Sequence, residues 1–216
     1  MMRVLWGMAL VLSAGALSAA SVEDVLGRLE RSEGEIKTLS FDYRQTASLS
    51  VGKTETAVSG RVSFQRPDRF RIETAGPAAQ TVVSDGTHLW IHTPAHKQVI
   101  RDTLKGVLGA QGVPAGLGSF QWKAADLKRE FNVSVDDAAG ETPVLVLTPK
   151  AGGDTVVRLW VDMKTGVAMK TALSAETVKT EVTLANVRVN PRLAKTLFRF
   201  KPPAGTEVLD MPVIAP

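Results

Sequence analysis

Apolar and polar side chains alternate with a period of two through most of the chain after residue 38. Near the start of this region, Leu39, Phe41 and Tyr43 are separated by the polar residues Ser40 and Asp42. Successive side chains of a β-strand point to opposite faces of the sheet, so this alternation predicts strands with one apolar and one polar face. A chain built mainly from such strands folds into a sheet that covers its core with one face and exposes the other to water.

The same pattern recurs in short segments that are divided by turn residues. The dipeptide Asp85-Gly86 separates two of them and predicts a hairpin, because these residues tolerate the positive φ angles of tight turns. In chain order, the predicted strands are residues 39–51, 58–64, 70–74, 81–84, 88–93, 97–101, 144–147, 156–161, 167–173, 178–189, 197–200 and 208–209. Such short connections indicate antiparallel neighbours, and a single twisted sheet of this many strands must curl or close.

Two stretches of the chain have no period-two pattern. Residues 22–36 carry apolar side chains at helical spacing after a capping-box-like start at Ser21 and Asp24, which predicts an amphipathic helix. Residues 102–128 form an insert with a short helical pattern followed by a glycine-rich stretch. The predicted fold is mainly β (α+β), a strongly curved antiparallel sheet that forms an incomplete barrel, closed by an N-terminal helix and a helical lid insert.

Residues 1–20 have the order of a secretory signal peptide: Arg3, an apolar run over residues 4–12, and small residues up to Ala20. The alternative is an N-terminal membrane anchor, but the apolar run is too short for a hydrocarbon core of ~30 Å. We expect cleavage after Ala20 and a single domain over residues 21–216. The chain contains no cysteine, so neither acylation at the cleavage site nor a disulfide framework is available.

Charge and motifs give little support to catalysis or to nucleic acid binding. The formal net charge of +4 is modest and basic residues are interleaved with acidic ones, so we expect no nucleic acid partner. Sequence patterns for a Gly-x-Ser-x-Gly nucleophile, a His-Glu-x-x-His zinc site and a phosphate-binding loop are missing. Asp136 and Asp137 are adjacent and would face opposite ways on a strand, so a turn is the better interpretation. We expect a protein that is not an enzyme and uses no cofactor.

The three histidines, His88, His92 and His96, suggest a metal site by their closeness in sequence. On a strand, however, His88 and His92 would stand about 13 Å apart, too far to share one zinc ion. A turn at Pro94 would separate His96 from both. We therefore expect no metal at these residues, and activity that survives a chelator.

Arg66 is the residue that a simple strand does not explain. Counting by two from Val58 puts it on the apolar face of its strand, where an unpaired charge is costly. The alternative is that the strand ends at Gln65 and Arg66 turns toward water. Pro67 favours extended geometry at the residue before it, and therefore the inward orientation.

A series of short motifs also runs in a fixed order along the chain. They are Phe41 and Gln45; Gly60, Phe64, Arg66-Pro67 and Phe70-Arg71; the run over residues 80–90; Pro94 and Gln98-Val99; the run over residues 146–150; and Phe198, Phe200, Pro203-Ala204-Gly205 and Val208. In this order and spacing they resemble the LolA family of periplasmic outer-membrane lipoprotein carriers, over nearly the whole mature chain. Ile72 stands where that family often has tryptophan, and the insert matches no family motif residue by residue.

The resemblance implies an incomplete antiparallel barrel under a helical lid, with the acyl chains of a lipoprotein held in or against its apolar concave face. It also implies that Arg66 is a lid latch, which hydrogen-bonds the lid backbone and holds the carrier closed. We expect its partners to be backbone carbonyls between Leu104 and Phe120. The residues expected to line the cavity are Phe64, Phe70, Trp90 and, from the lid, Leu104, Val107 and Leu108.

The resemblance implies, finally, a periplasmic protein that receives acylated lipoproteins from an inner-membrane lipoprotein-releasing transporter and passes them to an outer-membrane acceptor. We expect it to act as a monomer. Three alternatives remain open: a carrier or sensor of another amphiphile such as a glycolipid, an envelope-stress interaction module on the same fold, and an uncharacterised hydrolase. The missing catalytic motifs separate only the last of these from the others.

Overall fold

A computed structural model describes residues 20–50, 54–76, 79–103, 122–136 and 141–210 of the chain. Its strands are β1 (Thr38–Leu49), β2 (Thr54–Gln65), β3 (Arg69–Ala75), β4 (Gln80–Asp85), β5 (His88–Thr93), β6 (Gln98–Thr103), β7 (Phe131–Asp136), β8 (Val144–Pro149), β9 (Val156–Asp162), β10 (Val167–Ser174), β11 (Val178–Val189) and β12 (Glu207–Asp210). Its helices are α1 (Val22–Glu35) and α3 (Ala124–Glu130), with short 3-10 turns η1 (Pro94–His96) and η2 (Lys195–Phe198).

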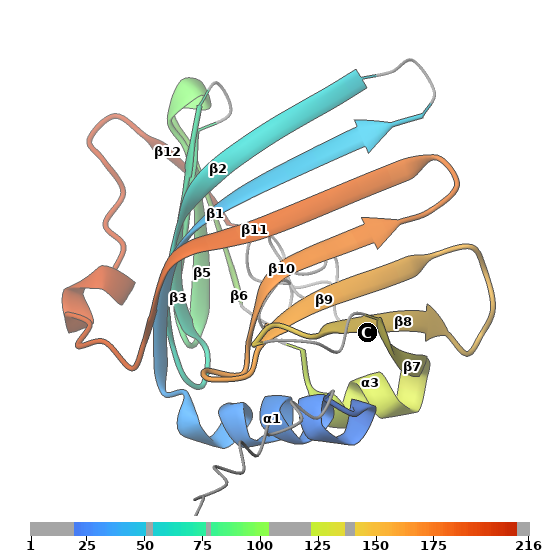
Figure 1. The fold of residues 1–216 in the computed structure, drawn as a ribbon. Coiled ribbons are helices and arrows are strands. Elements are labelled where there is room, and N and C mark those ends of the chain that lie inside the picture. Colours follow the sequence, from blue (N-terminus) through green and yellow to red (C-terminus); the bar gives the residue numbers. More distant parts are fainter. Residues whose placement is uncertain (1–19, 51–53, 77–78, 104–121, 137–140, 211–216) are drawn as a thin grey trace, which may run out of the picture.

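All strands of the described residues belong to one 12-stranded sheet with the order β12-β6-β5-β4-β3-β2-β1-β11-β10-β9-β8-β7, strongly curved and open along one side (Figure 1). Two antiparallel meanders, β1 to β6 and β7 to β11, meet where β1 pairs with β11. The predicted mainly β fold with a curved, incomplete barrel is therefore confirmed. One pairing differs from the prediction, because β12 runs parallel to β6.

The predictions for residues 197–200 and for the insert have different outcomes. Residues 197–200 are not a strand as predicted, because the chain turns through η2, where the N–H of Arg199 bonds the carbonyl of Thr196. In the insert, the structure contains α3, whereas residues 104–121 lie outside the described part of the chain. The predicted helix around Leu104, Val107 and Leu108 therefore remains a prediction.

Helix α1 begins with the capping box that the sequence predicts. The hydroxyl of Ser21 accepts a hydrogen bond from the N–H of Asp24 at 3.1 Å, and the Asp24 carboxylate accepts one from the N–H of Ser21 at 3.0 Å. Both bonds satisfy backbone donors that a helix start leaves free. The apolar side of the helix, with Val25, Leu26 and Leu29, is buried against the sheet.

The pairing of β1 with β11 shifts register between Ser40 and Asp42. On β11 this irregularity brings Asn186 to a positive φ of 52°. The carboxylate of Asp42 accepts hydrogen bonds from the Asn186 side chain and from Nε of Arg61, both at 2.7 Å. A bulge of this kind increases local twist and bends the strand, so Asp42 stabilises the curvature at the centre of the sheet.

This arrangement predicts a pH-dependent contribution of Asp42 to stability. Hydrogen bonds from Arg61 and then Asn186 hold the pKa of the Asp42 carboxyl below its ordinary value of 3.8. A carboxyl whose pKa is lowered by folding stabilises the protein above its unfolded pKa, and this contribution is lost as the pH falls through the folded pKa. We expect Asp42→Asn to be less stable than wild type at pH 6, and the difference to shrink as the pH drops below 3.8. Urea unfolding of both proteins at a series of pH values measures it, and a pH-independent difference would exclude a role for the charge.

Candidate functional site

A continuous row of apolar side chains crosses the sheet from β1 to β6. Paired residues of antiparallel strands point to the same face, so the pairing register defines the members of each row. One row is Phe41, Val62, Ile72, Val82, Ile91 and Ile100; a second is Leu39, Phe64, Phe70, Ser84 and Leu89. Apart from Ser84, these residues are apolar, and most of them are buried in one cluster.

The same face continues across the second meander. Val182 on β11 pairs with Thr171 on β10, Thr171 with Leu159 on β9, and Leu159 with Leu145 on β8. Here α1 and α3 cover the sheet and complete a second buried cluster with it. The two clusters together form one apolar face, which runs through nearly the whole curved sheet.

The position of the C-terminal segment shows which face of the sheet is convex. It passes outside the curve, where η2 contacts β3 and β4 (Figure 1). Phe198 of η2 is 2% exposed, and Val83 and Val99, which point away from the apolar rows, are fully buried. The long apolar rows therefore lie on the concave face, and a small separate core lies outside.

The predicted cavity-lining residues occupy different places. Phe64 and Phe70 lie opposite each other on the concave face and are buried in its cluster. Trp90 lies on the convex face, where its ring centre is 6.2 Å from that of Phe200. Leu89 and Ile91, its neighbours on β5, take the concave positions instead. This corrects the prediction for Trp90; Leu104, Val107 and Leu108 lie outside the described residues.

Arg66 lies just beyond the end of β2. It is exposed, its Nε donates a hydrogen bond to the carbonyl of Ile36 at 2.7 Å, and its N–H bonds the carbonyl of Lys37 at 2.9 Å. The strand thus ends at Gln65, as the alternative interpretation had it, and the inward strand position is wrong for Arg66. Its contact is the backbone that joins α1 to β1. The whole segment predicted to supply lid carbonyls lies outside the described residues, so the latch stays a prediction.

The histidine region forms a turn and an aromatic surface. Asp85 accepts hydrogen bonds from the N–H groups of Thr87 and His88, each at 2.8 Å, in the predicted hairpin. Burial alone would raise the pKa of Asp85, but these backbone bonds hold it below 3.8. The ring of His92 faces Phe200 on the convex side. Within the described part of the chain, no group of three or more His, Cys, Asp or Glu side chains could hold a metal ion.

The concave face is less covered toward the strand ends that lie far from α1. Leu49, at the end of β1, is 48% exposed, whereas Val58 and Leu173 are half-buried and pack against the two clusters. On β10, the buried hydroxyl of Thr171 has no hydrogen-bond partner among the described residues. This end of the face offers apolar surface that the described residues cover only in part.

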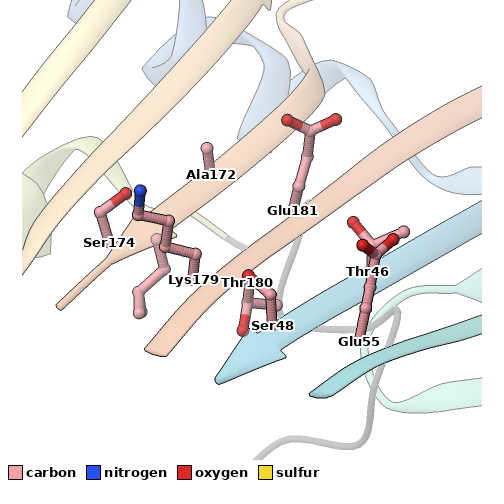
Figure 2. Close-up of a pocket in the computed structure, with 9 residues that line it drawn as sticks. Thr46, Ser48, Glu55, Ala172, Ser174, Lys179, Thr180 and Glu181 are labelled. Atoms are coloured by element: carbon pink, nitrogen blue, oxygen red, sulfur yellow. The ribbon is translucent and has the colours of Figure 1, made fainter. Parts of the chain in front are cut away.

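A cavity of about 260 Å³ lies at the ends of β1, β2, β10 and β11, and Figure 2 shows its lining. Ser48, Lys179 and Ser174 form one row across it, and Glu55 on β2 continues that row. Most of the lining side chains belong to the polar set that alternates with the apolar rows. Hydroxyl, carboxylate and ammonium groups do not suit an acyl chain, so this cavity is a poor site for the cargo, although Leu173 of the apolar face also lines it.

Sequence patterns did not single out Arg28 and Asn190, although both hold α1 in place. Arg28 donates hydrogen bonds to two carbonyls in the turn between β9 and β10. Asn190, with a positive φ of 55°, bonds the backbone between α1 and β1. Each of these backbone partners lies more than a hundred positions away in the sequence, which local patterns cannot show. The one local signal is that Asn190 precedes a proline, which indicates a special backbone position.

An open curved sheet with an apolar concave face and helices across one end defines the class of half-barrel proteins that can cover an apolar ligand. None of the helices in the described ranges is long and apolar enough to cross a membrane. The chain belongs to the LolA family: the family model described as "Outer membrane lipoprotein carrier protein LolA" matches residues 34–201.

Comparison with known proteins supports this assignment. The chain is 30% identical over 198 residues to an outer-membrane lipoprotein carrier protein of Chromobacterium violaceum, covering 91% of this chain and 93% of the relative. It is 32% identical over 201 residues to one of Halorhodospira halophila, covering 91% and 86%. Among solved structures, an uncharacterized conserved protein from Thermus thermophilus (TM-score 0.53, 12% identity, 88% of this chain and 98% of that one) shares the fold. MucB (TM-score 0.54, 16% identity, 83% and 62%) shares it too.

Proposed function

We propose that this protein is a periplasmic carrier that shields the acyl chains of lipoproteins on their way from the inner to the outer membrane. The observation that carries the proposal is the continuous apolar concave face in a chain of this family. Such a face suits the binding of extended hydrocarbon chains. The chemistry required of the protein is shielding, for which no catalytic group is needed.

The energetics of the cargo make a carrier necessary. Exposure of a lipid anchor to water costs about 0.8 kcal/mol per methylene, so two or three long acyl chains cost several tens of kcal/mol. Free diffusion of a lipoprotein between membranes is therefore excluded, and the anchor must be covered at every step. Loading from an inner-membrane lipoprotein-releasing transporter and unloading to an outer-membrane acceptor follow from the same cost.

The proposal includes export and processing of the chain. Residues 1–20 would act as the signal peptide, and residues 21–216 as one carrier domain that works as a monomer and binds no nucleic acid. Phe64 and Phe70 lie on the face that we propose for acyl chains. Leu104, Val107 and Leu108 would add lid surface to it.

The test is a transfer assay with the mature protein. Purified protein is incubated with inner-membrane vesicles that contain an acylated lipoprotein and the releasing transporter, and soluble lipoprotein in complex with the carrier is measured. We expect a soluble complex of one carrier and one lipoprotein, which unacylated lipoprotein does not form. Mass spectrometry of ligands copurified from the periplasm would contradict the proposal if it found only another amphiphile, such as a glycolipid.

Arg66 provides a sharper prediction. Hydrogen bonds to a charged group contribute about 1.5 to 3 kcal/mol each, enough for a few of them to hold a lid closed but still yield to cargo. We expect Arg66→Leu to fold, but to retain its cargo or to expose apolar surface to a fluorescent dye. Arg66→Lys should keep partial function, because an ammonium cannot reproduce the planar fork of a guanidinium. Wild-type transfer rates for Arg66→Leu would exclude the latch.

A further inference from the structure

Helix α1 is tied to the turn between β9 and β10 through the guanidinium group of Arg28. Nε donates to the carbonyl of Met163 at 3.0 Å, and one terminal nitrogen donates to the carbonyl of Lys164 at 2.9 Å. The other terminal nitrogen bonds the Glu35 carboxylate at 3.0 Å, and the Arg28 side chain is only 12% exposed. Two of these three bonds cross to the turn and depend on α1 staying docked, whereas the bond to Glu35 lies within α1.

The helix also approaches this turn more closely than most side chains would allow. The hydroxyl of Ser32, which donates to the carbonyl of Leu29 at 2.6 Å, lies 3.2 Å from the carbonyl oxygen of Gly166. A Cβ at Gly166 would lie 2.6 Å from Cβ of Ser32 and 2.9 Å from the carbonyl oxygen of Arg28. Gly166 has a φ of +71°, so glycine serves both the turn and the close contact.

The C-terminal end of α1 is held by Asn190. Its Oδ1 accepts hydrogen bonds from the N–H groups of Lys37 and Thr38, at 2.8 and 3.2 Å. Its Nδ2 donates to the carbonyl of Glu35 at 3.0 Å. The side chain of Asn190 thus fixes the connection between α1 and β1 to the end of β11. On the other side of the helix, Glu33 accepts a hydrogen bond from the N–H of Ala124, at the start of α3, at 3.0 Å.

We propose that α1 is a fixed wall of the concave face, positioned by Arg28 and Asn190, and that it stays docked when an acylated ligand enters. That the ligand is acylated rests on the proposed carrier function. Opening at α1 would break the Arg28 bonds and expose Val25, Leu26 and Leu29, which are at most 3% exposed. The ligand would then enter away from α1, near Leu49, where the described residues cover the concave face only in part.

Amide hydrogen exchange of the full mature protein, free and with a synthetic tripalmitoylated lipopeptide, tests this inference. In wild type we expect the amides of α1 to exchange no more than about tenfold faster than those of β1, with a change of less than about threefold when the lipopeptide binds. In Arg28→Met, which keeps an apolar stem but removes the donors, α1 should exchange at least about tenfold faster while β1 and β11 do not change. Asn190→Gly, which tolerates the positive φ but lacks the amide, should do the same at the C-terminal end of α1.

Arg101→Met is the matched control, because Arg101 is 49% exposed and pairs with Asp210 at the β6–β12 edge of the sheet, so its loss should leave α1 unchanged. Exchange of α1 that speeds up about tenfold or more on lipopeptide binding would overturn the fixed wall, and so would unchanged exchange in both Arg28→Met and Asn190→Gly. If the lipopeptide does not bind at all, the carrier proposal fails. The comparison of free wild type with the two variants then still decides whether Arg28 and Asn190 fix α1.

Discussion

Gly166→Ala is expected to lower the free energy of unfolding by roughly 2–5 kcal/mol, the sum of a left-handed backbone in a residue with Cβ and an overpacked contact. The added Cβ would meet Ser32 and the backbone of Arg28 well inside normal contact distance. Since both lie on α1, the helix or the turn must move. Denaturant unfolding should show a lower midpoint with an unchanged slope.

The matched control is Gly205→Ala. Gly205 has nearly the same φ, +74°, but nothing lies within 4 Å of a Cβ at that position. It should therefore show only the backbone cost, about 1–2 kcal/mol. An equal loss in both variants would mean that the close approach of α1 to the turn contributes nothing to stability.

A charge on the concave face is expected to abolish most ligand binding. Val58 is half-buried and packs against the concave cluster, while its neighbour Ala57 is exposed on the opposite face. An ionised carboxylate at Val58 would have to lose its water to an acyl chain, which is costly. We expect Val58→Glu to weaken binding of a tripalmitoylated lipopeptide at least about tenfold, or 1.4 kcal/mol.

Ala57→Glu introduces the same residue one position earlier in the same strand and should bind the lipopeptide like wild type. Equilibrium titration with a fluorescent lipopeptide measures both variants, and thermal unfolding checks that both are folded. If the two variants bind equally well, acyl chains do not lie on this face, and the proposed carrier site is wrong.

Patterns with a short range in the sequence predicted much of the fold. Alternation over neighbouring residues gave most of the strands, though not β7, because it reflects the burial of one face, and Ser21 with Asp24 marked the start of α1. Asp85-Gly86 marked a hairpin for a similarly local reason. The parallel pairing of β12 with β6 has no local signal, because β6 ends at Thr103 and β12 begins only at Glu207.

Trp90 shows why the candidate site was harder to predict than the fold. On β5, apolar residues occupy successive positions, so alternation cannot decide which set faces inward, and a shift by one residue reverses every side chain. Phe198 and Phe200 give β5 and its neighbours apolar contacts on the convex face as well, and these contacts favour the orientation in which Trp90 faces outward. For Arg66, the spacing of the strand was extended one residue beyond its end at Gln65.

The meeting of the two meanders at β1 and β11 has a consequence for the order of folding. Each meander joins strands that are close in sequence, but Asp42 and Asn186, which bond across the seam, are 144 positions apart. Closing so long a loop is slow compared with forming a hairpin. Until β11 arrives, β1 has an unpaired edge that other unfolded chains can join. The strand at the centre of the finished sheet is thus among the first to be synthesised and the last to be protected.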